Sequence, residues 1–441
     1  MAEATALVSA RRGWREVLAS LASVRIAIVL GMGVVSGLPL LLTGSTLTYW
    51  LSTENVTIEE IGLFALVGVP YTFKFVWAPI IDQVPLPFLT KMLGRRRAWL
   101  ALAVAGTALS IAGLAATDPQ DALWWVAVAT LCIAFFSASQ DIVIDAYRIE
   151  ILDPEQQGLG AAATQWGYRV GMVLAGAAAL ALSDYIDWRF IFLGLAAIAA
   201  LGMVLVLLIP EPPPPADWEE QSRQPVLQKL KAGAIDPFVE FLTRRGALVI
   251  LAFVFFYKFG DAIGGWVASP FYREMGFTGV EIGSITKIFG VLATLAGVGV
   301  GGLLVARLGY YRALFAGGVF QAVTNLFFAW LALSGHDLGL LFLSIAFDNF
   351  AGGVGSAAFV AYLSFLCNVR YTATQYALFS SFTAFGRTVL STASGWLAGQ
   401  LGWFAFFAVT TLLALPGLLL LFWLMRIQAA PAQPAAAAKA R

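Results

Sequence analysis

Charged side chains are scarce in this sequence. Only 12% of its 441 residues are Asp, Glu, Lys or Arg, whereas about a quarter of a typical soluble domain is charged. Hydrophobic residues make up 60% of the chain, and long apolar runs recur along its whole length. A helix needs about 20 such residues to cross ~30 Å of hydrocarbon. The sequence therefore predicts an integral membrane protein.

Other scarce or missing features exclude whole classes of function. Cys132 and Cys367 lie within or at the end of apolar runs, which disfavours a disulfide or a metal site. The single histidine, His336, falls in a loop and is a poor proton relay. No phosphate-binding Gly-x-x-x-x-Gly-Lys-Ser/Thr, zinc His-Glu-x-x-His or Gly-x-Ser-x-Gly motif occurs. We therefore expect no enzyme activity, metal or cofactor, and the net charge of +1 does not indicate nucleic acid.

The apolar runs predict an all-α membrane protein with twelve transmembrane spans, at residues 26–50, 58–81, 97–116, 122–147, 156–183, 189–209, 246–270, 279–306, 311–334, 338–366, 374–400 and 402–425. Residues 210–245 form a polar linker that contains four consecutive prolines after Glu211, which indicates an extended tether followed by a surface helix. The linker separates two six-helix halves, 26–209 and 246–425. We expect a retained leader at 1–25 and a disordered Ala/Pro-rich tail at 426–441.

The basic residues outside the spans predict the orientation. The N-terminus, the even-to-odd loops and the C-terminus hold 20 of the 27 Lys and Arg, and the opposite loops hold only Arg189 and Arg273. Cytoplasmic loops carry the excess of basic residues in membrane proteins. We therefore expect both termini in the cytoplasm.

The two halves share sequence features. A Thr-x-x-Glu capping box opens the second span at Thr57 and the eighth at Thr278. Arg169 and Arg387 follow a glutamine by twelve residues in the fifth and eleventh spans, respectively. Two six-helix repeats with a site between them at the membrane midplane are the plan of the major facilitator transporters. Gly297-x-x-x-Gly301 and Gly395-x-x-x-Gly399 predict close helix packing.

The loop after the second span resembles a major facilitator motif. Pro79-Ile80-Ile81-Asp82 is followed, after an insert, by Gly94 and then Arg95, Arg96 and Arg97. The resemblance implies that Asp82 holds the cytoplasmic gate shut, with Arg148 as its partner. The alternative, that the arginines only fix the orientation, stays open.

Charged residues inside the spans predict a binding site. An ionised side chain at the bilayer centre costs roughly 2.5 to 3.5 kcal/mol on insertion scales, so each needs a partner, a wet cavity or a ligand. The bases at these depths are Lys74, Arg169, Lys258, Lys287 and Arg387, against three acids, Asp141, Asp261 and Asp348. This excess favours an anionic solute held by the two repeat-related arginines. Internal ion pairing is the alternative, and Lys258 with Asp261 has the spacing for it.

Neighbouring polar and aromatic residues complete the predicted substrate site: Gln140, Asn349, Gln375, Trp166, Tyr168 and Tyr257. The aromatic rings could stack on sugars, although packing is their commoner use in membrane helices. Protons are the predicted coupling ion, because buried carboxylates remain as carriers. Asp348 is the first candidate, followed by Asp141, Asp261 and Asp145. A structural role as partner of a buried base is equally open for each.

Several blocks of sequence also resemble the AmpG muropeptide permeases, over residues 31–423. They include Phe73-Lys74-Phe75, Ser137 to Asp145, Gly167-Tyr168-Arg169, Tyr257 to Ala262 and Ala373 to Leu378. The resemblance implies proton-driven import of anhydromuropeptides, that is N-acetylglucosaminyl-anhydro-N-acetylmuramic acid with or without its peptide. It also implies a place in the bacterial inner membrane, and roles in peptidoglycan recycling and β-lactamase induction, and hence in antibiotic resistance. The chain departs from the family pattern at Thr286 and Asp348, where Asn and Glu are expected.

Two alternatives remain. A kindred carrier would move another bulky anion, such as acetyl-coenzyme A, and a sensor would bind muropeptide without moving it. We expect a monomer in contact with membrane lipids and an anhydromuropeptide solute.

Overall fold

The computed structural model describes residues 14–215, 218 and 225–429. Within this part of the chain every regular element is a helix, and no strand occurs. The structure therefore has the all-α class that the sequence predicts. Parts of the predicted leader, linker and tail, at 1–13, 216–217, 219–224 and 430–441, lie outside the described residues.

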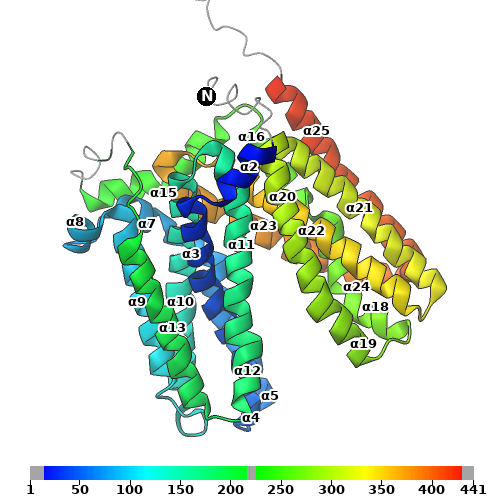
Figure 1. The fold of residues 1–441 in the computed structure, drawn as a ribbon, viewed down its shortest axis with the longest axis horizontal. Helices are drawn as coiled ribbons and strands as arrows, with labels where there is room; N and C mark the ends of the chain where they lie inside the picture. Colours follow the sequence, from blue (N-terminus) through cyan, green and yellow to red (C-terminus); the bar gives the residue numbers. More distant parts are fainter. Residues whose placement is uncertain (1–13, 216–217, 219–224, 430–441) are drawn as a thin grey trace, which may run out of the picture.

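The chain before the linker begins with a short helix, α2, and continues through the first half (Figure 1). Its elements are α2 (Trp14–Leu21), α3 (Val24–Leu42), α4 (Ser45–Thr53), α5 (Ile58–Leu63), η1 (Phe64–Gly68), α6 (Val69–Phe73), η2 (Lys74–Val76), α7 (Ala78–Gln83), α8 (Leu89–Leu93), α9 (Arg95–Leu114), α10 (Pro119–Ile151), η3 (Pro154–Gln156), α11 (Gln157–Val173), η4 (Leu174–Ala178), α12 (Ala179–Ser183) and α13 (Trp188–Leu208).

The rest of the described chain comprises the linker helix α15 and then the second half, which ends near the C-terminus. Its elements are α15 (Val226–Leu242), α16 (Ala247–Phe256), α17 (Phe259–Trp266), α18 (Ala268–Glu274), α19 (Gly279–Gly283), η5 (Ser284–Phe289), α20 (Gly290–Leu308), α21 (Tyr310–Ser334), α22 (Leu338–Leu366), η6 (Val369–Tyr371), α23 (Thr372–Ser391), α24 (Ser394–Leu413) and α25 (Leu415–Ala429).

Ten helices of the described part are long and apolar enough to cross a membrane. The second predicted span is instead divided among α5, η1, α6, η2 and α7. Pro70 and Pro79 stand near the starts of α6 and α7, where the missing proline amide is tolerated. The eleventh predicted span begins as α23, and Gly402, with a φ of +70°, turns the chain between the eleventh and twelfth.

Both predicted capping boxes are present. The Glu60 amide donates to the Thr57 hydroxyl at 3.3 Å, and the Thr57 amide donates back to the Glu60 carboxylate at 3.2 Å. Thr278 and Glu281 make the same pair of bonds, at 3.3 and 2.8 Å. Each box satisfies amides that a helix start leaves without partners, so the repeat extends to the local structure.

One of the two predicted glycine motifs packs closely. A Cβ at Gly297 would lie 2.0 Å from the Phe350 carbonyl oxygen, so only glycine lets α20 approach α22 this closely. The prediction for Gly395 and Gly399 is wrong, because nothing lies within 4 Å of a Cβ built at either one.

The two halves meet at one end of the molecule and diverge toward the other (Figure 1). The end where they meet is the closed end, and α2, α7 and the start of α23 lie there. Contacts between the halves join α7 and α10 to α23, and α11 to α20 and α22. Where α11 crosses α20, a Cβ at Gly158 would lie 2.5 Å from the Val305 Cβ, so the crossing depends on glycine.

Candidate functional site

A buried carboxylate joins the two halves at the closed end. Asp82, at the end of the first half's α7, accepts hydrogen bonds from the Thr374 amide and hydroxyl, each at 2.7 Å, and from the Ala373 amide at 3.2 Å. These are free amides at the start of α23, so Asp82 acts as a cap for a helix of the other half.

The ion partner of Asp82 is Arg96, at 2.7 Å. The predicted pairing with Arg148 is therefore wrong. Arg96 has no exposed side-chain surface and also binds Glu150 at 2.6 Å, while Arg95 binds the same glutamate at 2.8 Å. Two carboxylates and two guanidinium groups thus balance one another, as buried charges require.

The third arginine of the motif stabilises helix ends within the first half. Arg97 donates to the carbonyl oxygens of Val206 and Leu207 at 2.9 and 2.7 Å, at the end of α13. In return, Glu211 accepts from the amides of Arg96 and Arg97 at 2.8 and 3.1 Å, at the start of α9. Burial raises the pKa of Glu211, and these two amides partly oppose that rise.

Arg148 makes a second connection between the halves. Its guanidinium donates to the Ser364 hydroxyl on α22 at 3.1 Å and lies 5.3 Å from the centre of the Tyr376 ring on α23. Asp145, on its own helix, is its ion partner at 3.4 Å. Arg148 therefore contributes to closure through contacts other than the predicted one.

Gln375 lies at the closed end, near the start of α23. It is buried, and its amide donates to the Pro237 carbonyl oxygen at 3.0 Å and to Glu240 at 2.7 Å, both on α15. Burial alone would raise the pKa of Glu240, but hydrogen bonds from Arg244 and Gln375 lower it below its ordinary value. These contacts hold the Gln375 side chain on α15 in this conformation, and its role in substrate binding stays a prediction.

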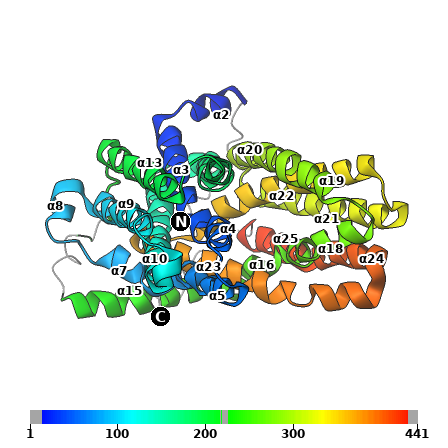
Figure 2. The same cartoon turned by 90° about the horizontal axis from the view of Figure 1, so that it is seen from below.

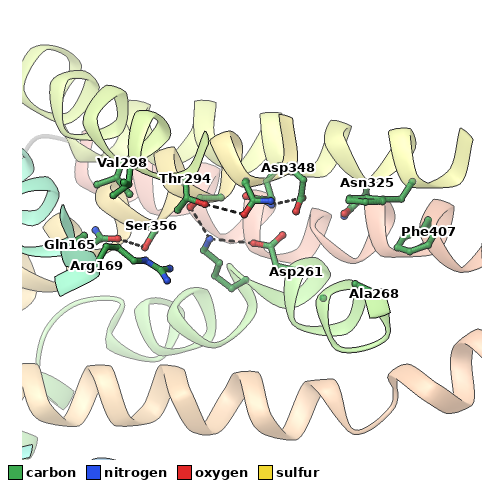
Figure 3. A pocket seen from close by; sticks show the side chains of 18 of the residues that line it. Gln165, Arg169, Asp261, Ala268, Thr294, Val298, Asn325, Asp348, Ser356 and Phe407 are labelled. Carbon is green, nitrogen blue, oxygen red and sulfur yellow. Dashed lines mark hydrogen bonds and ion pairs between the residues drawn. The ribbon is translucent and has the colours of Figure 1, made fainter. Parts of the chain in front are cut away.

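A cavity of about 320 Å³ lies within the second half and reaches α11 of the first half (Figure 3). This volume is at the lower end of the roughly 300 to 1,000 Å³ usual for small-molecule pockets. Its polar and charged lining residues are Gln165, Arg169, Lys258, Asp261, Tyr272, Thr294, Gln321, Asn325, Asp348, Asn349 and Ser356. Arg169 lies at one end of the cavity and Asn325 and Phe407 at the other, with the two acids between them.

Four of the described lining residues are charged. Lys258, in the break between α16 and α17, binds Asp261 at 3.2 Å and the Gly352 carbonyl oxygen at 3.4 Å. Asp348 accepts from Gln321 at 2.9 Å and Thr324 at 3.2 Å, and no basic side chain among the described residues lies within 4 Å of it. Arg169 completes the set from α11. With all four ionised, the charges cancel, so the predicted excess of bases is not found here.

Hydrogen bonds position the neutral side chains of the cavity. Asn349 accepts from the Thr294 hydroxyl at 3.0 Å and donates to the Ile345 carbonyl oxygen at 3.0 Å. Ser356 on α22 donates to Gln165 on α11 at 2.9 Å, and so joins the two halves at the cavity wall. One hydrogen bond at the cavity wall therefore crosses from α22 to α11.

A second polar cluster lies in the first half. Ser36 donates to Asp141, and Lys74, on the 3-10 segment η2, interacts electrostatically with both Asp141 and Asp145. Each half thus has a polar cluster that contains two acids and a lysine. Only the cluster of the second half lines the cavity described above.

Several other predicted site residues are not among the described residues that line that cavity. Arg387 has an exposed side chain on α23, and the side chain of Lys287 lies outside the described residues. Trp166 donates to the Leu295 carbonyl oxygen at 2.8 Å. Tyr257 is buried, donates to the Leu314 carbonyl oxygen at 2.9 Å and stacks on Phe359. Tyr168 is half-buried on α11, and buried Gln140 has no hydrogen-bond partner for its side chain among the described residues.

The sequence interpretation missed several residues of both sites. Gln321, Thr324 and Asn325 face the cavity or Asp348 from α21. Glu150 joins the network at the closed end. Gln321 and Asn325 are spaced i, i+4 inside an apolar span, which is a readable signal of a polar face.

The match to the Major Facilitator Superfamily family model covers residues 21–347 and 259–441. The anhydromuropeptide permease of Escherichia coli K12 is 38% identical over 90% of this chain and 79% of the relative. The chain belongs to the AmpG family of the major facilitator superfamily. A Rickettsia conorii protein that carries the transporter name AmpG 4 is 36% identical over 89% of this chain and 94% of the relative.

Solved structures agree with this assignment of the fold. FucP, a major facilitator transporter captured in the outward conformation, superposes with a TM-score of 0.66 at 14% identity, over 91% of this chain and 98% of FucP. The proton:xylose symporter XylE gives 0.64 at 14% identity, over 91% and 94%. The predicted AmpG resemblance and twelve-span major facilitator fold are confirmed. The protein is a multi-pass membrane transporter, and its AmpG relatives are named as permeases and transporters.

Proposed function

We propose that this protein imports anhydromuropeptides, N-acetylglucosaminyl-anhydro-N-acetylmuramic acid with or without its peptide, across the bacterial inner membrane. The observation that carries the proposal is the 38% identity to an anhydromuropeptide permease over 90% of the chain. The cavity supports it, because amide and hydroxyl groups suit a sugar and Arg169 suits a carboxylate.

The closed end faces the cytoplasm in this proposal, and both termini lie on that side. Support comes from Arg95, Arg96 and Arg97, which begin α9 at the closed end, where the positive-inside rule places the cytoplasm. The conformation described here is then outward-facing. For the solute to leave, the bonds from Asp82 to α23 and from Arg148 to Ser364 must break.

Protons are the coupling ion in this proposal. If Asp348 is ionised, the four described charges of the cavity cancel, and a solute carboxylate would bring an unbalanced negative charge. If Asp348 binds a proton, the cavity carries one net positive charge that the carboxylate balances. Anion binding and protonation therefore favour each other, which is the linkage that a symporter needs. Asp261 is the less suitable carrier, because Lys258 holds it at 3.2 Å.

The transporter acts as a monomer surrounded by lipid in this proposal, because one chain supplies both halves of the major facilitator fold. It needs no cofactor. In alternating access the two halves move relative to each other, with the solute between them.

Counterflow tests whether the protein transports muropeptide or only senses it. Proteoliposomes are loaded with unlabelled N-acetylglucosaminyl-anhydro-N-acetylmuramyl-tripeptide and diluted into a trace of the labelled compound. We expect a transient internal excess of label that external muropeptide abolishes and acetyl-coenzyme A does not. Binding without counterflow would contradict transport, and competition by acetyl-coenzyme A alone would contradict the proposed solute.

A further inference from the structure

The linker helix α15 has two faces with different surroundings. Its apolar side chains Ile235, Phe238, Val239 and Leu242 are 49%, 45%, 52% and 53% exposed. Their spacing of three, four and seven residues places them on one side of the helix. The opposite side carries Gly233, Pro237 and Phe241, which contact the protein.

The protein-facing side is fixed to both halves of the transporter. A Cβ at Gly233 would lie 2.7 Å from the Gln83 side chain at the end of α7, so α15 packs directly on the first half. Gln375 on α23 of the second half donates to Pro237 and Glu240. Arg244, just after α15, donates to the Leu366 carbonyl oxygen at 2.5 Å. These contacts determine where the apolar face points.

The apolar face of α15 points sideways, away from the helix bundle. Figure 2, drawn at 90° to Figure 1, shows α15 along the outer edge of the molecule beside α7, and α15 contacts α7, α16 and α23. The side of α15 that is opposite α7 therefore faces outward, toward what surrounds the membrane-spanning helices. Val76 in η2, Ile80 in α7 and Leu248 at the start of α16 are also apolar and exposed. The apolar face of α15 thus continues the lipid-facing surface of the neighbouring spans.

We propose that α15 is an interfacial helix whose apolar face, Ile235, Phe238, Val239 and Leu242, binds the acyl chains of the membrane leaflet at the closed end. Exposed Arg245 follows the helix and suits an anionic lipid headgroup. Exposed Thr243 lies on the polar flank, about 90° around the helix from the apolar face. Bound lipid would then hold a helix that contacts both halves at the closed end.

Depth-dependent quenching tests this contact without measuring transport. In a background carrying Cys132→Ser and Cys367→Ser, bimane is attached to Phe238→Cys, to Val239→Cys or to the control Thr243→Cys. The full-length protein is reconstituted into phosphatidylethanolamine and phosphatidylglycerol vesicles, with or without phospholipid brominated near the carbonyl end of its chains.

We expect bromolipid to quench the labels at 238 and 239 at least threefold more than the label at 243. Phe238 and Val239 are independent reporters, so misfolding of one variant leaves the other. Equal quenching at all three sites, or none at 238 and 239 in protein that elutes as folded, would overturn the proposal. A failure of muropeptide counterflow would not affect either result.

Discussion

Asp82 on α7 accepts two hydrogen bonds from Thr374 at the start of α23, each at 2.7 Å, so an acid of the first half caps a helix of the second. Its other carboxylate oxygen binds Arg96 at 2.7 Å, and all three residues are buried. Closure at this end therefore depends on one carboxylate with partners in both halves.

Asp82→Asn should open the closed end. The amide keeps one acceptor oxygen but has no charge, so it weakens both the pair with Arg96 and the cap of α23. Removing one partner of a buried ion pair costs roughly 3 to 5 kcal/mol, so even part of that loss shifts the equilibrium tenfold. We expect a maleimide to label Ala377→Cys, buried between α23 and the first half, about tenfold faster. Exposed Asp121→Asn is the matched control, and equal labelling in both variants would exclude the role of Asp82.

Gly158→Ala should impair closure at the crossing of α11 and α20. The added Cβ would lie 2.5 Å from the Val305 Cβ and 2.9 Å from the Gly302 carbonyl oxygen, so the helices must separate. The control is Gly194→Ala, where a Cβ meets nothing within 4 Å. That change should improve helix propensity by up to about 1 kcal/mol. We expect a severalfold loss of uptake for Gly158→Ala and none for Gly194→Ala. Wild-type uptake by both would mean that the crossing tolerates a methyl group.

Asp348→Asn should separate exchange from accumulation. Asn keeps an acceptor for Gln321 and Thr324 but binds no proton, so the solute can exchange while a proton gradient no longer drives it. The measurement compares counterflow with gradient-driven accumulation in the same vesicles, beside exposed Asp184→Asn. Unaltered accumulation in Asp348→Asn would remove this residue as the proton carrier.

Arg169→Gln and Arg387→Gln should differ in their effect on the half-saturating solute concentration, although the two arginines occupy equivalent positions in the sequence repeat. Arg169 lines the cavity and Arg387 does not. A hydrogen bond to a charged group contributes about 1.5 to 3 kcal/mol, so Arg169→Gln should raise the half-saturating solute concentration about tenfold or more. We expect a smaller change for Arg387→Gln and none for exposed Arg273→Gln. Equal losses for 169 and 387 would instead place both arginines on the solute.

Features that depend on local spacing could be read from the sequence. The capping boxes at Thr57 and Thr278 were predictable because the same four residues supply both partners. The close packing at Gly297 was predictable because helices that approach closely need residues without a Cβ at a fixed spacing. Lys258 and Asp261 were predictable as an ion pair because three residues separate them on a helix.

Features that depend on tertiary packing could not be read from the sequence. Asp82 has Arg96 as its partner because the insert folds through α8 and returns α9 to the end of α7, which no spacing rule gives. Gln375 occupies a repeat position equivalent to Gln157, yet it binds the linker helix α15. Gln321 and Asn325 mark a polar side of α21 in the sequence, but their spacing does not say that this side faces Asp348 on α22.

Accumulation of labelled N-acetylglucosaminyl-anhydro-N-acetylmuramyl-tripeptide in proteoliposomes, under an inwardly directed proton gradient, is the most direct measurement. The proposed coupling predicts an internal concentration above the external one, which collapses when a protonophore is added. Entry that stops at the external concentration with the gradient intact would contradict proton-driven import of muropeptides.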